Sequence, residues 1–467
     1  MSQVIQIERL VDEQRFGRFG LHLLLLSFLA MFADGYDITA MAFAAPQLAR
    51  LWHIPAAHFG PVLSASLVGI LFGAPALGWI GDHRGRRTAI LIGLVCFGLS
   101  TLAVVWATNL TQVMLLRFLS GVGIGGLMPN TIALNSELAP RRYRATLIVL
   151  MFTGITLGSG TPGPVAAWLL PRYGWQILFW IGGIVPLLVA ALLYFRLPES
   201  IKFLARQAGR LDELRRMARA IRPGMPIAED ARFVLTETSA PGPSGAGQLF
   251  HGAFALITPV LWVCFVSALM TNYFLNSWLP LIFERSGMPP AEAALASTLY
   301  HLGATVGGVL VSVLLDRFGF LAIAVLFAIA VFAVAGIGWP GLGHGAVTAF
   351  AALAGLTVLG AQFGNNAASG LLYPPEFKSR GVGWALAVGR FGSIVGPLLG
   401  GMLIGLHLPL QQLFLAAALP LLFGVAAALV LARLCYLRLG RLQLDDAVST
   451  TNGSSGNIGP LHKGNDS

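Results

Sequence analysis

The chain has 467 residues, of which 56% are hydrophobic and only 11% charged, and its mean hydropathy is +0.75. Water-soluble domains carry about a quarter charged residues, so this composition excludes an ordinary soluble protein. The net charge of +10 raises the alternative of nucleic-acid binding. The placement of the basic residues along the chain argues against it.

Twelve apolar segments follow one another, each of the roughly 20 residues that cross a bilayer as an α-helix. They are 19–45, 57–80, 88–107, 110–136, 143–169, 175–197, 252–283, 291–315, 319–340, 343–372, 379–406 and 410–437. The longest polar stretch between them divides the twelve into six and six. The sequence therefore predicts an all-α integral membrane protein. We expect five parts: a cytoplasmic N-terminal segment (1–18), a six-helix bundle (19–197), a central loop (198–250), a second six-helix bundle (251–437) and a disordered tail (438–467).

Basic residues alternate in number from one connecting segment to the next. If the N-terminus is cytoplasmic, the segments on that side hold 25 of the 30 Lys and Arg, and the opposite loops hold three. Such an asymmetry is the positive-inside signal of membrane topology. We therefore expect both termini in the cytoplasm, a bacterial-type inner-membrane location, contact with membrane lipid and no nucleic-acid partner.

The central loop begins with a segment in which apolar residues stand at helical spacing among arginines, Ile201 to Ile221. This pattern predicts an amphipathic helix at the membrane surface.

Two pairs of residues recur at nearly one offset. Asp82 and Asp316, after the second and eighth segments, are 234 residues apart, and Arg144 and Arg380 are 236 apart. The two halves are thus predicted to be repeats, as in many secondary transporters, whose sites lie between repeats near the midplane.

The turn after the second segment combines an acid, several arginines and glycines that let helix ends approach closely. We interpret it as a gate that opens and closes as the halves rock; the alternative is anchoring by positive charge alone. Glu137 and Glu376 are expected to pair with Arg144 and Arg380 within this gate. The predicted gate residues are Gly78, Asp82, Arg86, Arg87, Glu137, Arg144, Asp316, Arg317, Glu376 and Arg380.

Three motifs resemble those of the major facilitator superfamily. They are Gly78-x-x-x-Asp82-x-x-Gly85-Arg86-Arg87, Arg117-x-x-x-Gly121-x-Gly123-x-Gly125 and Leu197-Pro198-Glu199-Ser200. His83 stands where the family usually has Arg. The resemblance covers about residues 15–440 and implies twelve transmembrane helices in two pseudo-symmetric six-helix bundles.

Asp34-Gly35-Tyr36-Asp37 in the first segment resembles the DGxD signature of the aromatic acid:proton symporter family, the 4-hydroxybenzoate and benzoate carriers. This resemblance implies proton-coupled uptake of an aromatic carboxylic acid by alternating access. Three alternatives stay open: a carrier of another organic anion such as nicotinate, an exporter, and a transporter-like receptor.

Asp34 and Asp37 are three residues apart and so share one helix face. Acids inside a bilayer usually face a cavity and mark function, and two acids so close repel one another, which favours binding of a proton. The alternative is that both are helix-end groups at the interface with water. His301 is a third proton-coupling candidate, because histidine titrates near neutral pH.

Arg117 and Arg390 are the basic residues inside apolar segments, and a guanidinium matches a carboxylate in shape. Either could meet the substrate, or Arg117 could form a structural salt bridge with Asp34 or Asp37. Aromatic and amide side chains complete the predicted substrate-binding set of Arg390, Arg117, Tyr36, Asn365, Asn366, Asn272 and Trp384.

The sequence contains no Gly-x-x-x-x-Gly-Lys-Ser/Thr loop for a nucleotide, no metal-ligand spacing and no nucleophile constellation. The three cysteines lie in or at the ends of apolar segments, where we expect them to pack as small apolar side chains. We expect no cofactor, no metal and no enzymatic activity, and a monomer whose partners are a small aromatic acid and a proton.

Overall fold

A computed structural model describes residues 3–14, 17–223, 225, 227, 231–235, 246–252, 254–373 and 378–439. The predicted gate residue Glu376, the side chain of Asp316 and the tail from residue 440 onward lie outside the described residues.

Twelve helices or helix pairs in this part of the chain are long and apolar enough to cross a membrane, as predicted. The first six are α2 (Arg18–Leu51), α3 (Phe59–Arg84), α4 (Arg86–Ala103), α5 with α6 (Leu110–Gly125, Leu127–Leu138), α7 with α8 (Arg141–Gly160, Pro162–Tyr173) and α9 (Gln176–Arg196). The last six are α12 (Phe254–Arg285), α13 (Pro290–Phe318), α14 (Phe320–Ile337), α15 (His344–Leu372), α16 (Lys378–Gly405) and α17 (Leu410–Leu439).

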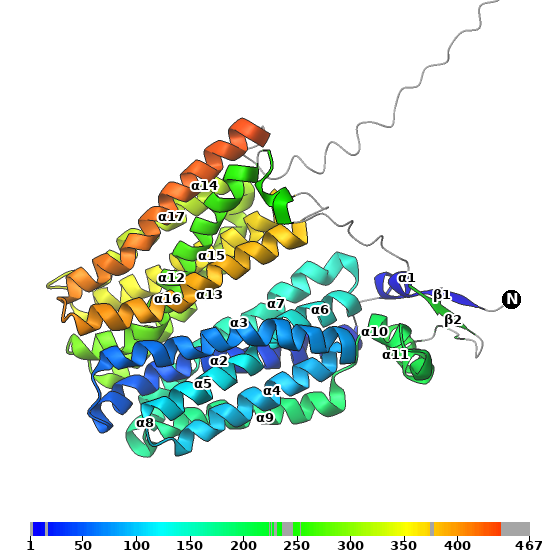
Figure 1. The fold of residues 1–467 in the computed structure, drawn as a ribbon, viewed down its shortest axis with the longest axis horizontal. Helices are drawn as coiled ribbons and strands as arrows, with labels where there is room; N and C mark the ends of the chain where they lie inside the picture. Colours follow the sequence, from blue (N-terminus) through cyan, green and yellow to red (C-terminus); the bar gives the residue numbers. More distant parts are fainter. Residues whose placement is uncertain are drawn as a thin grey trace, which may run out of the picture.

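These helices form two bundles, which we call the N-terminal half (α2–α9) and the C-terminal half (α12–α17) (Figure 1). We call the end of the molecule at which α2 begins the base, and the opposite end the far end. The prediction of two related six-helix bundles is confirmed.

Glycines make the pseudo-symmetry of the halves visible. Gly69 of α3 and Gly121 of α5 lie directly against the partner helix, and Gly303 of α13 and Gly355 of α15 do so 234 residues later. In the α2–α7 pair, Gly158 abuts the Phe32 carbonyl; in the α12–α16 pair, Gly396 abuts the Met270 carbonyl, 238 residues later. Small residues permit this close approach of backbones, so one packing scheme is used twice.

The two halves meet at the far end. Gly60 of α3 lies against Gly401 of α16, and Gly163 of α8 lies against the Ala294 carbonyl of α13. By the same offsets of 234 and 238 these are one contact, repeated. From there the bundles spread apart toward the base (Figure 1), so the far end is the closed end.

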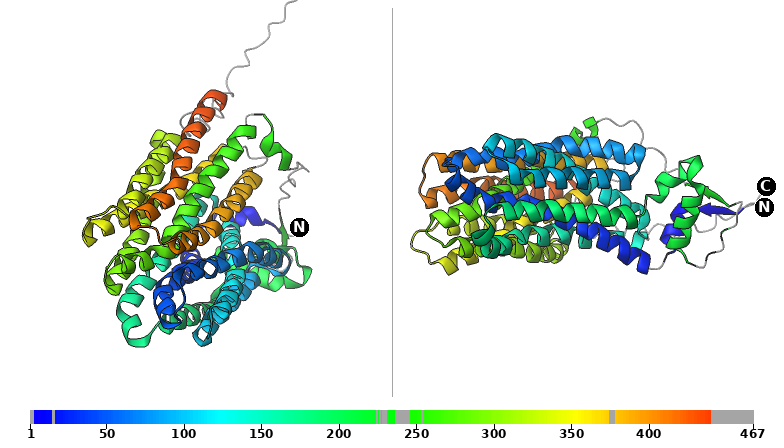
Figure 2. Two further views of the ribbon diagram at one scale, coloured as in Figure 1. Left: turned by 60° about the vertical axis from the view of Figure 1, so that its left-hand side comes forward. Right: turned by 90° about the horizontal axis from the view of Figure 1, so that it is seen from below.

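A small unit projects beyond the bundles at the base (Figure 2, right view). It contains α1 (Ile7–Asp12), α10 (Ile201–Ala205), α11 (Leu211–Ile221) and a parallel pair of short strands, β1 (Val4–Gln6) and β2 (Arg232–Val234). The strand pair was not expected from the sequence. The 201–221 segment is two helices joined by a turn, and its apolar residues are buried against those of α1, which include Ile7, Leu10 and Val11.

The small unit is attached to the N-terminal half. The Asp12 carboxylate pairs with Arg141 at 3.1 Å and accepts a hydrogen bond from its backbone N–H. The Gln14 amide donates to the Leu138 carbonyl at 2.6 Å. The N-terminal segment and the central loop therefore form one body that rests on the loop between α6 and α7.

The close packing of α2 on α7 leads to a stability prediction. A Cβ at Gly158 would overlap the Phe32 carbonyl, whereas one at the exposed Gly345 would meet nothing. Gly158→Ala should destabilise the protein by about 1–3 kcal/mol through overpacking, and Gly345→Ala should not. Thermal melting of both purified variants in detergent tests this. Equal melting temperatures would show that α2 and α7 are not in contact as described.

Candidate functional site

Asp37 and Arg117 form a buried ion pair inside the N-terminal half. Arg117 Nη1 donates to Asp37 Oδ1 at 2.6 Å, and the two side chains are 2% and 1% exposed. Arg117 Nη2 donates to the Asp37 carbonyl and to Ser66 Oγ, both at 3.2 Å, and Thr101 Oγ1 donates to Asp37 Oδ1 at 3.0 Å. The pair thus connects α2, α3, α4 and α5, and Arg117 meets a protein carboxylate in this structure.

The close approach of α3 and α5 brings Arg117 within reach of α2. A Cβ on Gly121 would overlap the backbone of Ser66, the same residue whose hydroxyl accepts from Arg117. The glycine motif of the fourth span therefore positions the arginine that precedes it.

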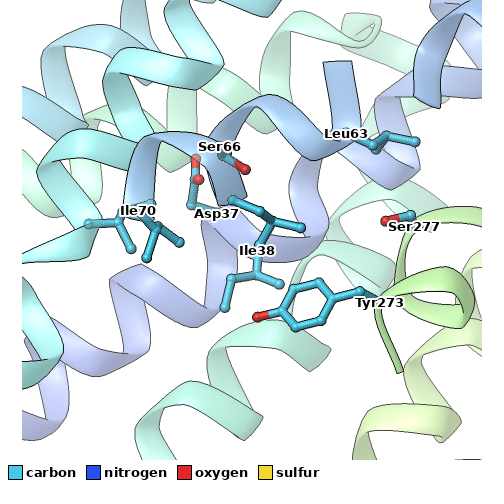
Figure 3. A pocket seen from close by; sticks show the side chains of 9 residues that line it. Asp37, Ile38, Leu63, Ser66, Ile70, Tyr273 and Ser277 are labelled. Carbon is cyan, nitrogen blue, oxygen red and sulfur yellow. The ribbon is translucent and has the colours of Figure 1, made fainter. Parts of the chain in front are cut away.

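A cavity lies beside this ion pair, between the two halves (Figure 3). Asp37 and Ser66 lie on its N-terminal wall, and Asp37 Oδ2 has no hydrogen-bond partner within the described residues. Tyr273 and Ser277 of α12 line it from the C-terminal half. Sequence reasoning missed Ser66, Tyr273 and Ser277; their polar groups inside apolar spans were the available signal.

Asp34 lies near a charge of the opposite half. It is 5% exposed, and in the part of the chain described here its Oδ1 has no hydrogen-bond partner. It interacts electrostatically with Asp37 and with Arg390 of α16, and Tyr273 interacts with both Asp34 and Arg390. Asp34, Tyr273 and Arg390 therefore form a polar group between the halves.

Two predicted substrate-binding aromatics lie elsewhere. Tyr36 is buried inside the N-terminal half, where its hydroxyl donates to the Leu178 carbonyl at 3.2 Å. Trp384 is 47% exposed and stacks on Trp262, with ring centroids 6.2 Å apart. Neither lines the cavity, because Tyr36 points to α9 and Trp384 pairs with its neighbour on α12.

The predicted amide residues differ in environment. Asn272 Oδ1 accepts from the Tyr300 hydroxyl at 2.7 Å, and Asn365 Nδ2 donates to the Cys264 carbonyl at 3.2 Å. Asn366 is exposed on α15. These contacts hold Asn272 and Asn365 within the C-terminal half.

His301 of α13 lies at the interface between the halves. Its Cβ lies near Gly160 at the end of α7, and its ring packs edge-on against Tyr300 at 5.3 Å. Its side chain is buried.

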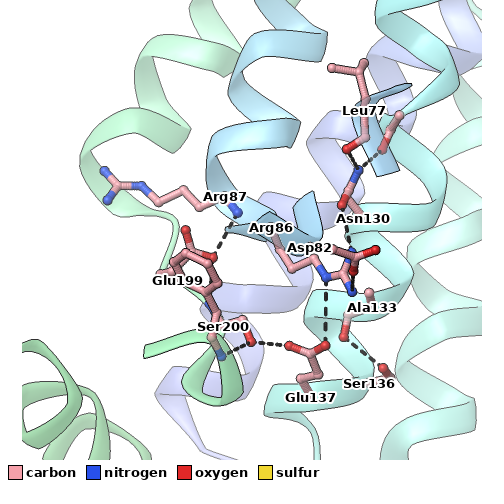
Figure 4. A network of polar contacts seen from close by, with 12 residues as sticks. Leu77, Asp82, Arg86, Arg87, Asn130, Ala133, Ser136, Glu137, Glu199 and Ser200 are labelled. Atoms are coloured by element: carbon pink, nitrogen blue, oxygen red, sulfur yellow. Dashed lines mark hydrogen bonds and ion pairs between the residues drawn. The ribbon is translucent and has the colours of Figure 1, made fainter. Parts of the chain in front are cut away.

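The predicted gate residues of the N-terminal half form a network at the base (Figure 4). Arg86 pairs with Asp82 at 2.6 Å, approaches Glu137 at 3.8 Å and donates to Asn130 Oδ1 at 3.3 Å. Glu137 also accepts from the Ser200 hydroxyl. Arg144 donates to the Ala139 carbonyl, so the expected Glu137–Arg144 pair is not formed; the Arg86 side chain and Ser200 contact Glu137 instead.

Glu199, from the third family motif, completes this network. Its carboxylate accepts from the backbone N–H groups of Arg87 and Ser200 at 3.1 and 2.8 Å. Burial raises its pKa, and these N–H donors act in the opposite direction. Gly85 has φ +101° and leaves no room for a Cβ beside Glu199, so this turn requires glycine.

Other gate positions make fewer contacts in this conformation. A Cβ on Gly78 would meet nothing within 4 Å. Arg317 lies over the Phe318 ring at 5.4 Å. Arg380 lies in the first turn of α16 and has an interaction partner.

An ion pair at the far end was not predicted. Arg50, at the end of α2, pairs with Glu284, at the end of α12, at 2.9 Å. The Ser64 hydroxyl of α3 also donates across the interface to the Ile394 carbonyl of α16 at 2.8 Å. Polar contacts thus accompany the glycine contacts that join the halves.

The sequence profile of the Major Facilitator Superfamily matches residues 26–361 and 261–438. The chain belongs to this superfamily. It is therefore a multi-pass membrane transporter and not an enzyme. In the described residues no group of three or more His, Cys, Asp or Glu could hold a metal ion.

Curated relatives cover most of the chain. A gallate transporter of Pseudomonas putida is 34% identical over 93% of this chain and 96% of its own. The 4-hydroxybenzoate transporter PcaK of Pseudomonas putida is 35% identical over 92% and 96%, and a benzoate transport protein of Acinetobacter baylyi is 32% identical over 92% and 93%.

Solved structures share the fold at lower identity. The crystal structure of a D-xylose-proton symporter superposes with a TM-score of 0.68 at 17% identity, covering 88% of this chain and 97% of the other. A partially occluded inward-open structure of the xylose transporter XylE from E. coli gives a TM-score of 0.69 at 17% identity, covering 89% and 98%.

The buried ion pair leads to a prediction. Arg117→Met should destabilise the protein by about 3–5 kcal/mol, because it leaves the Asp37 carboxylate buried without a counter-charge. Removing both charges, in Asp37→Asn with Arg117→Met, should recover much of that loss. Thermal melting of the single and double variants decides; a double variant less stable than Arg117→Met would contradict an isolated pair.

The far-end ion pair leads to another. Arg50→Glu should shift the population toward far-end-open molecules about two- to fivefold, since a partly exposed pair contributes up to about 1 kcal/mol. Arg50→Glu with Glu284→Arg should restore the distribution. Arg285→Glu, a charge change at an exposed neighbour, is the matched control. Spin labels at the exposed residues Tyr173 and Trp339 report the far-end separation; an unchanged distance distribution in Arg50→Glu would exclude this role.

Proposed function

We propose that the protein takes up an aromatic carboxylic acid, of the hydroxybenzoate or benzoate type, together with protons, by alternating access. The observation that carries the proposal is the polar group between the halves, in which Asp34 lacks a hydrogen-bond partner for Oδ1 among the described residues and interacts with Arg390. The relatives named as gallate, 4-hydroxybenzoate and benzoate transporters support the substrate class.

Arg390 is the proposed carboxylate ligand. Unlike Arg117, whose guanidinium contacts Asp37 and Ser66, it has no printed ion pair within 4 Å in the described residues. A guanidinium presents parallel N–H donors that fit a carboxylate. The glycines at 389, 392 and 396 bring α16 against α12, which places Arg390 beside the interface. Binding an anion there would satisfy a charge that the bilayer interior otherwise penalises.

Asp34 and Asp37 are the proposed proton acceptors. Asp37 shares one oxygen with Arg117 and Thr101 and leaves Oδ2 toward the cavity. Asp34 shares its helix face and has the less compensated charge. A proton on this pair would offset the negative charge of the bound carboxylate, so that substrate and proton cross together. His301, buried against Gly160 at the same interface, is the proposed third member of the proton path.

The base is the proposed cytoplasmic side. The connecting segments there carry most of the arginines, among them those at 84, 86, 87, 141, 142 and 144, as the positive-inside rule requires. Both termini would then be cytoplasmic, in a bacterial inner membrane. The present conformation, closed at the far end, would face inward. Gly78 has space for a neighbour, which the C-terminal half would fill when the base closes.

A second candidate is transport of a related anion by the same site. A niacin transporter of Acinetobacter baylyi is 29% identical over 92% of this chain, and nicotinate carries the same carboxylate on an aromatic ring. A competition panel of benzoates, nicotinate and tricarboxylates against labelled 4-hydroxybenzoate separates the two; direction is tested by preloading vesicles.

The experiment is uptake of labelled 4-hydroxybenzoate and benzoate by cells or proteoliposomes carrying the protein. Collapse of the proton gradient should abolish accumulation, and Asp34→Asn should reduce it at least tenfold, because the site loses its titratable group. Asp212→Asn, on the exposed face of α11, is the matched control and should transport normally. Uptake that ignores the proton gradient would exclude coupling, and normal accumulation by Asp34→Asn would exclude this site.

A further inference from the structure

The pseudo-symmetry of the fold allows the two walls of the cavity to be compared position by position. On α2 and α12 equivalent residues are 238 apart, as Gly158–Phe32 and Gly396–Met270 show. On α3 and α13 they are 234 apart, as Gly69 and Gly303 show. Each lining residue of the N-terminal wall therefore has an identifiable counterpart in the C-terminal half.

The N-terminal wall of the cavity is largely apolar. Besides Asp37 and Ser66, it consists of Ile38, Leu63, Leu67, Ile70 and Ile124. Branched aliphatic side chains of this kind fit the face of an aromatic ring, which gains its binding energy from removal of apolar surface from water.

The C-terminal wall is polar at the equivalent positions. The counterpart of Ile38 is Asn276, that of Leu63 is Ser297 and that of Leu67 is His301. The polar residues Tyr273 and Ser277, three residues before and one after Asn276 on α12, already line the cavity. Asn276 thus belongs to the helix face that meets the ligand.

Asn276 carries an unused acceptor. Its Oδ1 is buried and, within the described residues, receives no hydrogen bond. By contrast, Oδ1 of Asn272, one turn earlier, is already taken by the Tyr300 hydroxyl at 2.7 Å. A buried carbonyl oxygen without a donor costs about 1–3 kcal/mol, so a ligand that supplies an O–H to Asn276 gains what an unsubstituted ring does not.

We propose that Asn276 determines specificity for hydroxylated aromatic acids by accepting a hydrogen bond from a ring hydroxyl. This inference rests on the proposed function. The ring lies with one face on the aliphatic N-terminal wall, its carboxylate directed to Arg390 and its hydroxyl to Asn276. A site that hydrogen-bonds a substrate hydroxyl discriminates against the analogue that lacks it, because the polar group of the site is then unpaired.

The test compares benzoate with 4-hydroxybenzoate, 3-hydroxybenzoate and 3,4,5-trihydroxybenzoate in uptake and in ligand-induced thermal stabilisation of the purified protein. Asn276→Leu keeps the side-chain size and removes the acceptor. It should weaken apparent affinity for at least one hydroxylated acid about five- to tenfold, the worth of a neutral hydrogen bond, and leave benzoate unchanged. Asn276→Ser, which retains an acceptor, should recover part of the preference.

Asn272→Leu is the matched comparison, because it removes an amide from the same helix that is already hydrogen-bonded within the protein. It should lower transport of hydroxylated and unhydroxylated acids alike. If Asn276→Leu lowers benzoate and the hydroxybenzoates by the same factor, or changes neither, the specificity role is overturned while the proposed function stands. If the wild-type protein neither binds nor transports any aromatic acid, both are overturned.

Discussion

The Asp37–Arg117 pair is the interaction on which the arrangement of the site depends. Two charges that are 2% exposed or less are tolerated in a low-dielectric interior only with close geometry and additional hydrogen bonds. Ser66 and Thr101 supply those bonds, and glycines in α3 and α5 bring the helices close enough. With Arg117 committed to Asp37, Asp34 is left to interact with a charge of the other half.

The glycine packing is symmetric between the halves, whereas the charges are not. At the position equivalent to Asp34 the C-terminal half has Asn272, and at that of Arg117 it has Ala351. Conversely, the counterpart of Arg390 is Phe152. A repeated scaffold lets the halves rock about the interface in either direction, while the unequal charges create one site with a negative and a positive side. The symmetry thus serves the motion, and its violations serve the chemistry.

The sequence predicted the twelve spans and the two halves because length, hydropathy and charge asymmetry are local or additive properties. It also singled out Asp34, Asp37, Arg117 and Arg390, since a charge inside an apolar span is conspicuous. It did not identify the partner of Glu137, the orientation of Tyr36 toward α9 or the Arg50–Glu284 pair. Those depend on helix rotation and on which distant helices meet, and helical periodicity alone does not give either.

The contacts that close the far end are weak enough to be reversed. Arg50 is 60% exposed in its pair with Glu284, and such pairs contribute up to about 1 kcal/mol. The stronger network at the base, from Asp82 through Arg86 to Glu137, lies within the N-terminal half and its loops, so in this conformation it does not hold the halves together. A difference of about 1.4 kcal/mol changes a population tenfold. The charge balance among Asp34, Arg390 and a bound ligand, inside the membrane, is therefore large enough to decide which end is open.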